Sequence, residues 1–584
     1  MSPGLSPLSD SLSAPPTPES FRQNPTDLST KWLVQKFGGT SVGKFPIKIA
    51  TDVVAKHLDG HKVAISPPSP RSVDGRSSGS SSPRRNGILG FTPLNGDSVK
   101  SALPEFHVTV DLIKDEHFKA ARSSIRDPEI LAELEKEIDS DCEWLRSFLC
   151  AAQVIDEISS RSKDSVIGLG EKLACKLMAA VLRDQVYMHV AVLFSILQIS
   201  WIDSQGMEAE YVSLEDIVPS SHLTGDSDLS VGGISLEQPF YDELAKVIAQ
   251  RIDQCGSRIP VVTALFVGFF GPVPGSLLAQ IGRGYTDLCA ALLAVGLNAS
   301  ELQIWKEVDG IFTADPRKVP SARLIPVISP DEAAELTYYG SEVVHPFVME
   351  QAIRKKIPIR IKNVQNPSGG GTVIHPAPED PVQDSQWTNG HTTNPSSERP
   401  PTHLPLGTNG YGFDDPRNRR LPTAVTIKEN IVVINVHSNR KSVSHGFLAG
   451  IFGTLDRYGV VVDLISTSEV HVSMAIADGI GKRMADRFVV ELKRFGEVSV
   501  EHDLAILSLV GKHMRSMVGV AAKMFSSLAE RNVNIEMISQ GASEINISCL
   551  IAARDAVKAL NIIHQGCLKI TPEEPMGRVG PWLF

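Results

Sequence analysis

Apolar residues recur along this 584-residue chain in two alternating patterns, and their alternation predicts the fold class. Residues 32–37, 259–271 and 301–308 are short apolar runs of the kind that forms buried strands, whereas residues 286–297 have the spacing of a buried helix. Segments of both kinds follow one another over residues 31–375. We therefore expect an α/β domain whose mostly parallel sheet is sandwiched by helices.

A different pattern begins near residue 425 and occurs twice. Each copy is expected to form a strand, a helix and two further strands in that order. The first copy comprises residues 430–438, 444–459, 460–468 and 470–477, and the second comprises residues 504–511, 518–532, 533–541 and 545–552 with a closing helix at 555–567. We infer two related small modules, over residues 425–500 and 501–570.

Polar segments of low complexity separate these regions. Residues 1–30 are expected to form a disordered tail, residues 571–584 a second tail, and residues 376–424 an interdomain linker. Within the α/β domain, residues 66–86 are too rich in serine, proline and arginine to pack. The insert at 186–205 is apolar, but its uncharged run is shorter than the ~20 residues that span a bilayer.

Charge and cysteine content narrow the functional classes. A formal net charge of −10 argues against a surface that binds nucleic acid. The seven cysteines are scattered without a C-x-x-C pair, which favours reduced thiols over a disulfide framework or a zinc site. The N-terminal residues lack both a secretory apolar core and an arginine-rich amphipathic pattern. We expect a cytoplasmic protein with neither membrane nor nucleic-acid partners.

The segment KFGGTS at 36–41 joins the first expected strand to a helix. Gly38 and Gly39 allow backbone N–H groups to approach a phosphate, and the helix N-terminus and Lys36 add positive charge. The spacing matches neither the G-x-x-x-x-G-K-[ST] loop nor the G-x-G-x-x-G dinucleotide fingerprint. Taken alone, the segment could equally be a tight strand-to-helix turn with a solvated lysine.

Further segments in a fixed order carry a family resemblance. KFGGTS is followed by GRGYTD at 282–287, WKEVDGIFTADPRKV at 305–319 and a long segment at 335–367 that contains SEVVHP. Together they resemble the catalytic core of the aspartate kinases in the amino-acid kinase superfamily, and Lys306 and Glu307 match the fungal type. The C-terminal repeat resembles a pair of ACT domains, ferredoxin-like units that bind amino acids at paired interfaces. A plainer alternative is two modules used only for dimerisation.

The resemblance implies a fold, a reaction and its partners. The fold is an amino-acid kinase domain over residues 31–375 followed by two ferredoxin-like ACT domains. The reaction converts ATP and L-aspartate into ADP and 4-phospho-L-aspartate, the first step toward threonine, methionine and isoleucine, with Mg²⁺ as cofactor. A homo-oligomer formed through the ACT domains is implied as well. The alternative function is a catalytically impaired protein that senses an amino acid through its ACT pair.

The resemblance also implies the site residues one by one. Lys36 and Asp287 are implied to be catalytic, with Asp287 organising the phosphoryl group and its magnesium. Glu171 is implied to hold the substrate ammonium group and Arg283 its α-carboxylate. The implied ATP contacts are Lys36, Gly38, Gly39, Lys306, Glu307, Phe312 and Arg317, and the implied substrate contacts are Thr40, Ser41, Glu171, Phe269, Arg283 and Thr286.

Several of these residues have plainer interpretations. Asp287 also suits the N-cap of the helix at 286–297, and Glu171 could be a solvated glutamate in the first turn of a helix. Arg283 could lie at the surface or face a phosphate, and Phe269 could be an ordinary core aromatic. Only the placement of these side chains in the fold separates the alternatives.

The last expectations concern regulation and three segments that depart from the family pattern. Polar residues at the ends of the repeat's strands are predicted to hold a free amino acid, and the resemblance points to L-threonine. These residues are Asp463, Ser466, Gln540 and Asn546. The chain departs from the family pattern at 62–85, 186–205 and 264–267, where its composition is typical of a faulty gene model.

Overall fold

The computed structural model describes six stretches of the chain. They are residues 22–66, 105–155, 166–184, 207–263, 285–375 and 421–570, with short gaps at 28, 167, 215–216, 218–237, 341–343, 439–445, 480 and 516. The expected low-complexity segment, the apolar insert, residues 264–267 and almost all of the linker lie outside these stretches. The chain divides into two units, described separately below. The first contains most residues up to Val308, and the second contains Asp309–Ile361 and the residues from Gly370 onward.

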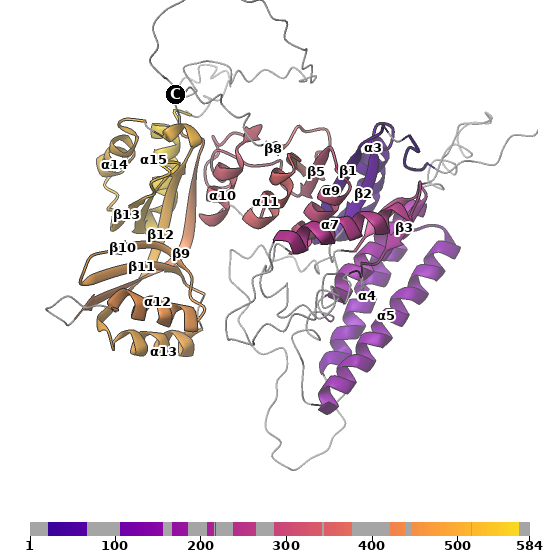
Figure 1. The fold of residues 1–584 in the computed structure, drawn as a ribbon, viewed down its shortest axis with the longest axis horizontal. Coiled ribbons are helices and arrows are strands. Elements are labelled where there is room, and N and C mark those ends of the chain that lie inside the picture. Colours follow the sequence, from indigo (N-terminus) through magenta and orange to yellow (C-terminus); the bar gives the residue numbers. More distant parts are fainter. Residues whose placement is uncertain are drawn as a thin grey trace, which may run out of the picture. The chain divides into compact units, whose positions relative to one another are not determined.

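A parallel sheet forms the centre of the first unit (Figure 1), as the alternating pattern predicts. Its strands lie in the order β3-β4-β2-β1-β5. The central strand β1 (Trp32–Phe37) is buried from Leu33 onward, because both of its faces are covered. The other strands are β2 (Lys62–Ser66), β3 (Ala209–Val212), β4 (Ile259–Val262) and β5 (Glu301–Lys306).

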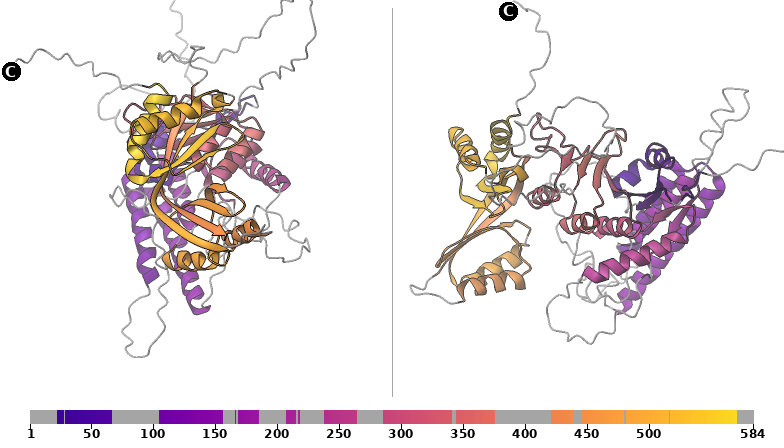
Figure 2. Two further views of the ribbon diagram at one scale, coloured as in Figure 1. Left: turned by 90° about the vertical axis from the view of Figure 1, so that its left-hand side faces the viewer. Right: turned by 45° about the horizontal axis from the view of Figure 1, so that its top comes forward.

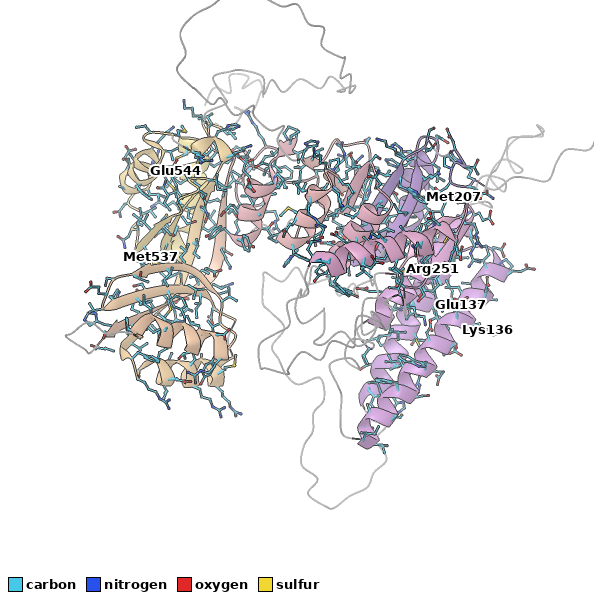
Figure 3. The ribbon with its side chains drawn as sticks, in the orientation of Figure 1. Lys136, Glu137, Met207, Arg251, Met537 and Glu544 are labelled. Carbon is cyan, nitrogen blue, oxygen red and sulfur yellow. The ribbon has the colours of Figure 1, made fainter. Side chains whose placement is uncertain are left out.

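Helices pack around this sheet. Helix α9 (Tyr285–Gly296) is buried from Tyr285 to Ala294, which explains its almost uniformly apolar sequence. Residues 168–184 form another buried helical stretch, and Lys176 within it lies 3.1 Å from Glu137, a residue of α5 labelled in Figure 3. The remaining helices are α1 (Gly39–Lys44), α2 (Pro46–Lys48), η1 (Ile49–Val54), α3 (Ala55–His57), α4 (Glu105–Ser124), α5 (Pro128–Ile155) and α7 (Gln238–Asp253).

Part of the expected N-terminal tail is packed against this unit. The Asn24 side chain is buried, accepts a hydrogen bond from the Val63 N–H at 2.7 Å and donates to the carbonyl oxygens of Val63 and Arg258. Arg22 forms a β-bridge with Met207. The prediction of a disordered tail over residues 1–30 is therefore corrected for residues 22–27, because a polar side chain finds buried backbone partners there.

The second unit begins with the rest of the α/β region. Strands β7 (Ile359–Asn363), β8 (Thr372–Ile374) and β6 (Val327–Ile328) lie side by side in that order. Helix α10 (Pro330–Tyr338) begins with a capping box, in which the hydroxyl of Ser329 accepts from the Glu332 N–H and the Glu332 carboxylate accepts from the Ser329 N–H. Helix α11 (Pro346–Arg354) follows.

The C-terminal repeat folds into one antiparallel sheet in the order β10-β11-β9-β12-β14-β13 (Figure 1). Helices α12 and α13 lie at one end of this sheet, and α14 and α15 lie at the other. Every element expected in the repeat is confirmed. The strands are β9 (Ala424–Ser438), β10 (Val462–Thr467), β11 (His471–Ala477), β12 (Gly496–Val510), β13 (Met537–Gln540) and β14 (Asn546–Ala552), and the helices are α12 (Phe447–Arg457), α13 (Lys482–Leu492), α14 (Val520–Glu530) and α15 (Ala556–Cys567).

The two modules share their long strands β9 and β12, visible as extended curved ribbons in Figure 2. Residues 424–428 of β9 pair with residues 506–510 of β12, whereas residues 431–438 pair with residues 496–504 and with β11. The register shifts between these stretches, where Asn430 and Asp503 have φ of 58° and 60°. The start of β9 therefore completes the sheet of the second module.

Candidate active site

Three polar residues lie at the carboxyl edge of the parallel sheet in the first unit. Lys36 is near the end of β1, Ser66 ends β2 opposite Lys36, and Thr263 directly follows β4. Parallel α/β sheets bind their ligands at this edge. Ser66 and Thr263 are 1% and 0% exposed, and within the described part of the chain their hydroxyl oxygens have no hydrogen-bond partner. Buried oxygens without partners are available to a ligand.

Lys36 and Asp287 form a buried ion pair at this edge. Lys36 Nζ lies 2.5 Å from Asp287 Oδ1, and the two side chains are 10% and 13% exposed. Asp287 lies inside the first turn of α9 and not before it, so its carboxylate faces a lysine and does not cap the helix. Burying a charge is unfavourable unless it is paired, and here each side chain supplies the partner of the other.

Glu171 lies beside this pair and is only 6% exposed, so the alternative of a solvated glutamate does not hold. The hydroxyl of Tyr285, the first residue of α9, donates a hydrogen bond to the Glu171 carboxylate. Burial raises the pKa of Glu171 to about 7, while this hydrogen bond and the charge of Lys36 act in the opposite direction. Burial also raises the pKa of Tyr285 far above its ordinary value, so its hydroxyl stays protonated. Lys36, Glu171, Tyr285 and Asp287 are called the buried cluster below.

Sequence reasoning missed Tyr285 and Thr263 as site residues. Tyr285 lies within the GRGYTD segment, next to Thr286 and Asp287, and a hydroxyl-bearing aromatic inside a motif is a signal that could have identified it. Thr263 lies within the apolar run at 259–271, and only the sheet order places it near β2. Thr286 itself is 9% exposed in the first turn of α9.

At Gly38, in the glycine segment, the structure has room for a side chain. A methyl group on Gly38 would meet the Ser41 hydroxyl at 3.6 Å and the Trp305 carbonyl oxygen at 3.8 Å, which are ordinary contacts. The backbone of Gly38 is extended, with φ of −78°, so its conformation does not require glycine either. Gly39 begins α1, Ser41 is buried, and the Thr40 side chain lies outside the described residues. A requirement for glycine at position 38 would therefore come from a ligand.

The expected nucleotide contacts fall in both units. Lys306 and Glu307 belong to the first, at the end of β5, and Glu307 lies 3.1 Å from Lys44 of α1. Phe312 and Arg317 belong to the second, where Phe312 forms a β-bridge with Leu324. The Arg317 side chain is 89% exposed and pairs with Asp315 at 3.1 and 3.2 Å. Phe269 and Arg283 lie outside the described residues.

Two of the expected effector contacts already have partners in the fold. Asp463 lies 2.6 Å from Lys428, and the buried Asn546 donates to Glu335 at 2.9 Å while accepting from the Ser548 hydroxyl at 2.9 Å. Ser466 and Gln540, in contrast, are exposed on β10 and β13, the edge strands of the sheet. These edge strands contribute Leu464 and Met537 to one core, and Met537 is labelled in Figure 3.

Other kinds of site are absent from the described residues. No group of three histidine, cysteine or acidic side chains there could hold a metal ion, and all seven cysteines are free thiols. Among the helices that the structure describes, none is both long and apolar enough to cross a membrane.

Comparisons with known proteins agree with this geometry. A family model of the amino acid kinase family matches residues 31–363, and a model of an ACT domain matches residues 507–566. The aspartokinase of Schizosaccharomyces pombe is 48% identical and covers 96% of this chain and 98% of the relative. The aspartokinase of Saccharomyces cerevisiae is 46% identical and covers 92% of this chain and 93% of the relative.

Solved structures support the same fold. The structure of Escherichia coli aspartokinase III in complex with aspartate and ADP has a TM-score of 0.60 and 24% identity, and the match covers 92% of this chain and 99% of that chain. The expected resemblance to fungal aspartate kinases and the expected fold class are both confirmed. The chain belongs to the aspartokinases, with an amino acid kinase domain followed by ACT modules.

Proposed function

We propose that this chain transfers the γ-phosphoryl group of ATP to the side-chain carboxylate of L-aspartate, giving ADP and 4-phospho-L-aspartate. The observation that carries the proposal is the buried cluster at the carboxyl edge of the sheet, in a chain nearly half identical to fungal aspartokinases. The Lys36–Asp287 ion pair places a charged lysine and a carboxylate together, which favours a kinase over an impaired sensor. The product would feed threonine, methionine and isoleucine synthesis.

The main task of the protein in this reaction is to control charge. The attacking carboxylate of aspartate has a reference pKa of about 3.9 and is ionised at neutral pH, so no general base is needed. Repulsion between this anion and the phosphates is the main barrier that the site must lower. Lys36 and the backbone N–H groups near Gly38 and Gly39 would supply positive charge for the phosphates. Lys306, Glu307, Phe312 and Arg317 would complete the nucleotide contacts.

Magnesium is proposed as the cofactor, held mainly by the phosphate oxygens of ATP. The residues present fit such an ion, because the Asp287 carboxylate and the partnerless hydroxyl oxygens of Ser66 and Thr263 are hard oxygen donors at the same sheet edge. When bound, the ion neutralises phosphate charge. Asp287 would orient the phosphoryl group through its contact with Lys36.

L-Aspartate is proposed to bind with its ammonium group on Glu171. A buried carboxylate beside Tyr285 is suited to a cation, because a cation of the substrate would compensate the buried negative charge. Arg283 would bind the α-carboxylate through its planar fork, and Thr40, Ser41, Phe269 and Thr286 would line the rest of the pocket.

Regulation is proposed to come from the ACT modules. L-Threonine would bind at Asp463, Ser466, Gln540 and Asn546, and the modules would join the chain into a homo-oligomer. Effectors act through different affinities for two states, with couplings of about 1 to 3 kcal/mol. We further propose that the enzyme works in the cytoplasm.

A substrate comparison tests the proposed function. ADP release by the full chain is measured with ATP and magnesium, in the presence of L-aspartate, L-glutamate or no amino acid, while threonine binding is followed by calorimetry. The proposal expects release that depends on L-aspartate and falls with bound threonine. Threonine binding without aspartate-dependent release would instead support the amino-acid sensor.

A further inference from the structure

Tyr285 and Asp287 lie two residues apart in the first turn of α9 and contact different members of the buried cluster. The Tyr285 hydroxyl donates to Glu171, and the Asp287 carboxylate pairs with Lys36. Tyr285 is 5% exposed and Glu171 is 6% exposed, so water does not readily replace either partner. One helical turn therefore fixes the position of both acidic groups.

The other groups near Glu171 give it little support. Lys36 acts on it through its charge but is paired with Asp287. Cys289 on α9 is buried, and burial raises the pKa of its thiol well above the ordinary value, so it stays neutral. Cys175, on the same helical stretch as Glu171, donates to the Val262 carbonyl oxygen at 3.6 Å. Within the described residues, Tyr285 is thus the one recorded hydrogen-bond donor to the Glu171 side chain.

We propose that Tyr285 is a positioning residue for aspartate, whose hydroxyl keeps the Glu171 carboxylate ionised and oriented to receive the substrate ammonium group. This inference rests on the proposed role of Glu171. A buried carboxylate without a donor takes up a proton, because burial penalises its charged form. A protonated Glu171 has no charge to offer an ammonium group, so the loss of the donor weakens aspartate binding without touching ATP.

The pH dependence of aspartate use follows from the same contact. The pKa of Glu171 is about 7, so the ionised form that binds aspartate declines as the pH falls through 7. In the free enzyme, kcat/KM for aspartate should therefore fall on the acid side of that value. Removing the Tyr285 hydroxyl removes an interaction that favours the ionised form, and the acid limb should move to higher pH.

The test compares Tyr285→Phe with the wild-type full chain between pH 5.5 and 9. A hydrogen bond to a charged group changes the equilibrium between the protonated and ionised forms by a factor of about ten or more. The acid limb of kcat/KM for aspartate should move up by about one pH unit. KM for aspartate at pH 7 should then rise about fivefold, because the ionised fraction of Glu171 falls from about one half to about one tenth. The kcat at saturating aspartate and pH 9, and the KM for ATP, should stay within about twofold because neither depends on Glu171 protonation.

Tyr241→Phe is the matched control. Tyr241 is a buried tyrosine on α7, 5% exposed, and it is not a member of the buried cluster. The substitution removes one phenolic hydroxyl from the same unit. The acid limb of kcat/KM for aspartate in Tyr241→Phe should match that of the wild type. An unshifted limb in Tyr285→Phe, or an equal rise of the KM values for aspartate and ATP, would overturn the inference and leave Tyr285 as packing.

Two further variants keep the inference testable and separate it from the proposed function. If Tyr285→Phe does not fold, site-specific incorporation of 3,5-difluorotyrosine at position 285 provides a stronger hydrogen-bond donor. The acid limb of kcat/KM for aspartate should then move to lower pH. No movement would again overturn the inference. Glu171→Gln tests the function itself. An unchanged aspartate KM in Glu171→Gln would remove the ammonium role, whereas a raised KM together with an unshifted Tyr285→Phe profile would reject only the role of Tyr285.

Discussion

The buried cluster and the four expected effector contacts are two sets of polar residues in the same chain. The two sets differ in the partners and the exposure of their side chains. In the cluster, Lys36 and Asp287 meet in an ion pair that excludes most water. In the effector set, Asp463 and Asn546 are occupied by Lys428 and Glu335, while the other two contacts are exposed on edge strands. The polar groups of the first set contact one another, whereas polar groups in the second also hold the sheet and α10 together.

The difference teaches which kind of sequence signal predicts a site. A charged residue buried at a sheet edge is costly to the fold, so its presence in a motif indicates chemistry. A polar residue at a strand end is often used by the fold itself, because strand ends leave backbone and side-chain groups that need partners. One truncation and four substitutions test this contrast, beginning with the largest expected effect.

Truncation after Arg420 should abolish cooperative folding of the remaining kinase segment 309–361. Ala314 and Val319 of that segment pack into the core of the second ACT module, and Glu332 accepts hydrogen bonds from Thr423 and the Lys512 N–H. Removing the modules exposes this surface and leaves Glu332 without two donors. Thermal melting and dye binding measure the outcome, with removal of residues 571–584 as the control. A truncated chain that melts cooperatively and retains activity would show that the two regions are independent.

Lys36→Ala should lower kcat by about 10²- to 10³-fold, because a preorganised charge that stabilises a transition state contributes about 2.7 to 4 kcal/mol. The variant also leaves Asp287 buried without its partner, so the melting temperature should fall as well. Steady-state kinetics below the melting temperature separate the two effects. Near wild-type turnover would remove Lys36 from the catalytic set.

Glu171→Gln should stabilise the protein while weakening aspartate binding. The pKa of Glu171 is raised from 4.5 to about 7, so the folded state holds this proton more tightly than the unfolded state does. Stability is therefore lost as the pH rises from about 4.5 to 7 and is not regained above it. At pH 8 the variant should be more stable by about 1 to 3 kcal/mol, and near pH 4 it should have no advantage. Denaturant unfolding at both values measures this, and equal stability at pH 8 would contradict the burial of an ionised Glu171.

Asn546→Ala and Gln540→Ala form a matched pair in the effector set. Asn546→Ala removes the amide that donates to Glu335 and accepts from Ser548, and it should cost about 1 to 3 kcal/mol of stability. Gln540→Ala, at an exposed position, should leave the melting temperature unchanged and alter only threonine affinity. Calorimetry with threonine and thermal melting distinguish the two variants. The reverse pattern would assign Gln540 to the fold and Asn546 to the ligand.

The sequence predicted local elements well because they depend on nearby residues. The strand expected at 32–37 is β1, and the helix expected at 286–297 is α9, shifted by one residue. The elements expected in the C-terminal repeat are likewise present, because alternation and helical spacing are local patterns, but α13 and residues 496–503 of β12 were not predicted. The motifs around Lys36 and Asp287 predicted that these residues belong to one site, and the structure brings their side chains together.

Properties that depend on long-range pairing could not be read from the sequence. The sharing of β9 and β12 between modules follows from pairings such as Lys428 with Ile506, which no local pattern indicates. Asn24 resembled the rest of a polar tail, and its burial against Val63 is visible only once the sheet is formed. Tyr285 gained its role from Glu171, which lies on a distant segment of the chain. Partners far apart in sequence are thus what the motif reasoning missed.

Trapping of the acyl phosphate tests the central claim most directly. The full chain is incubated with ATP, magnesium, L-aspartate and hydroxylamine, and the hydroxamate formed from 4-phospho-L-aspartate is measured beside Lys36→Ala. The account predicts hydroxamate in equal amount to the ADP released by the wild type and a loss of about 10²-fold or more in the variant. Hydroxamate formation that is absent in the wild type, or undiminished in Lys36→Ala, would contradict the assignment of phosphoryl transfer to the buried cluster.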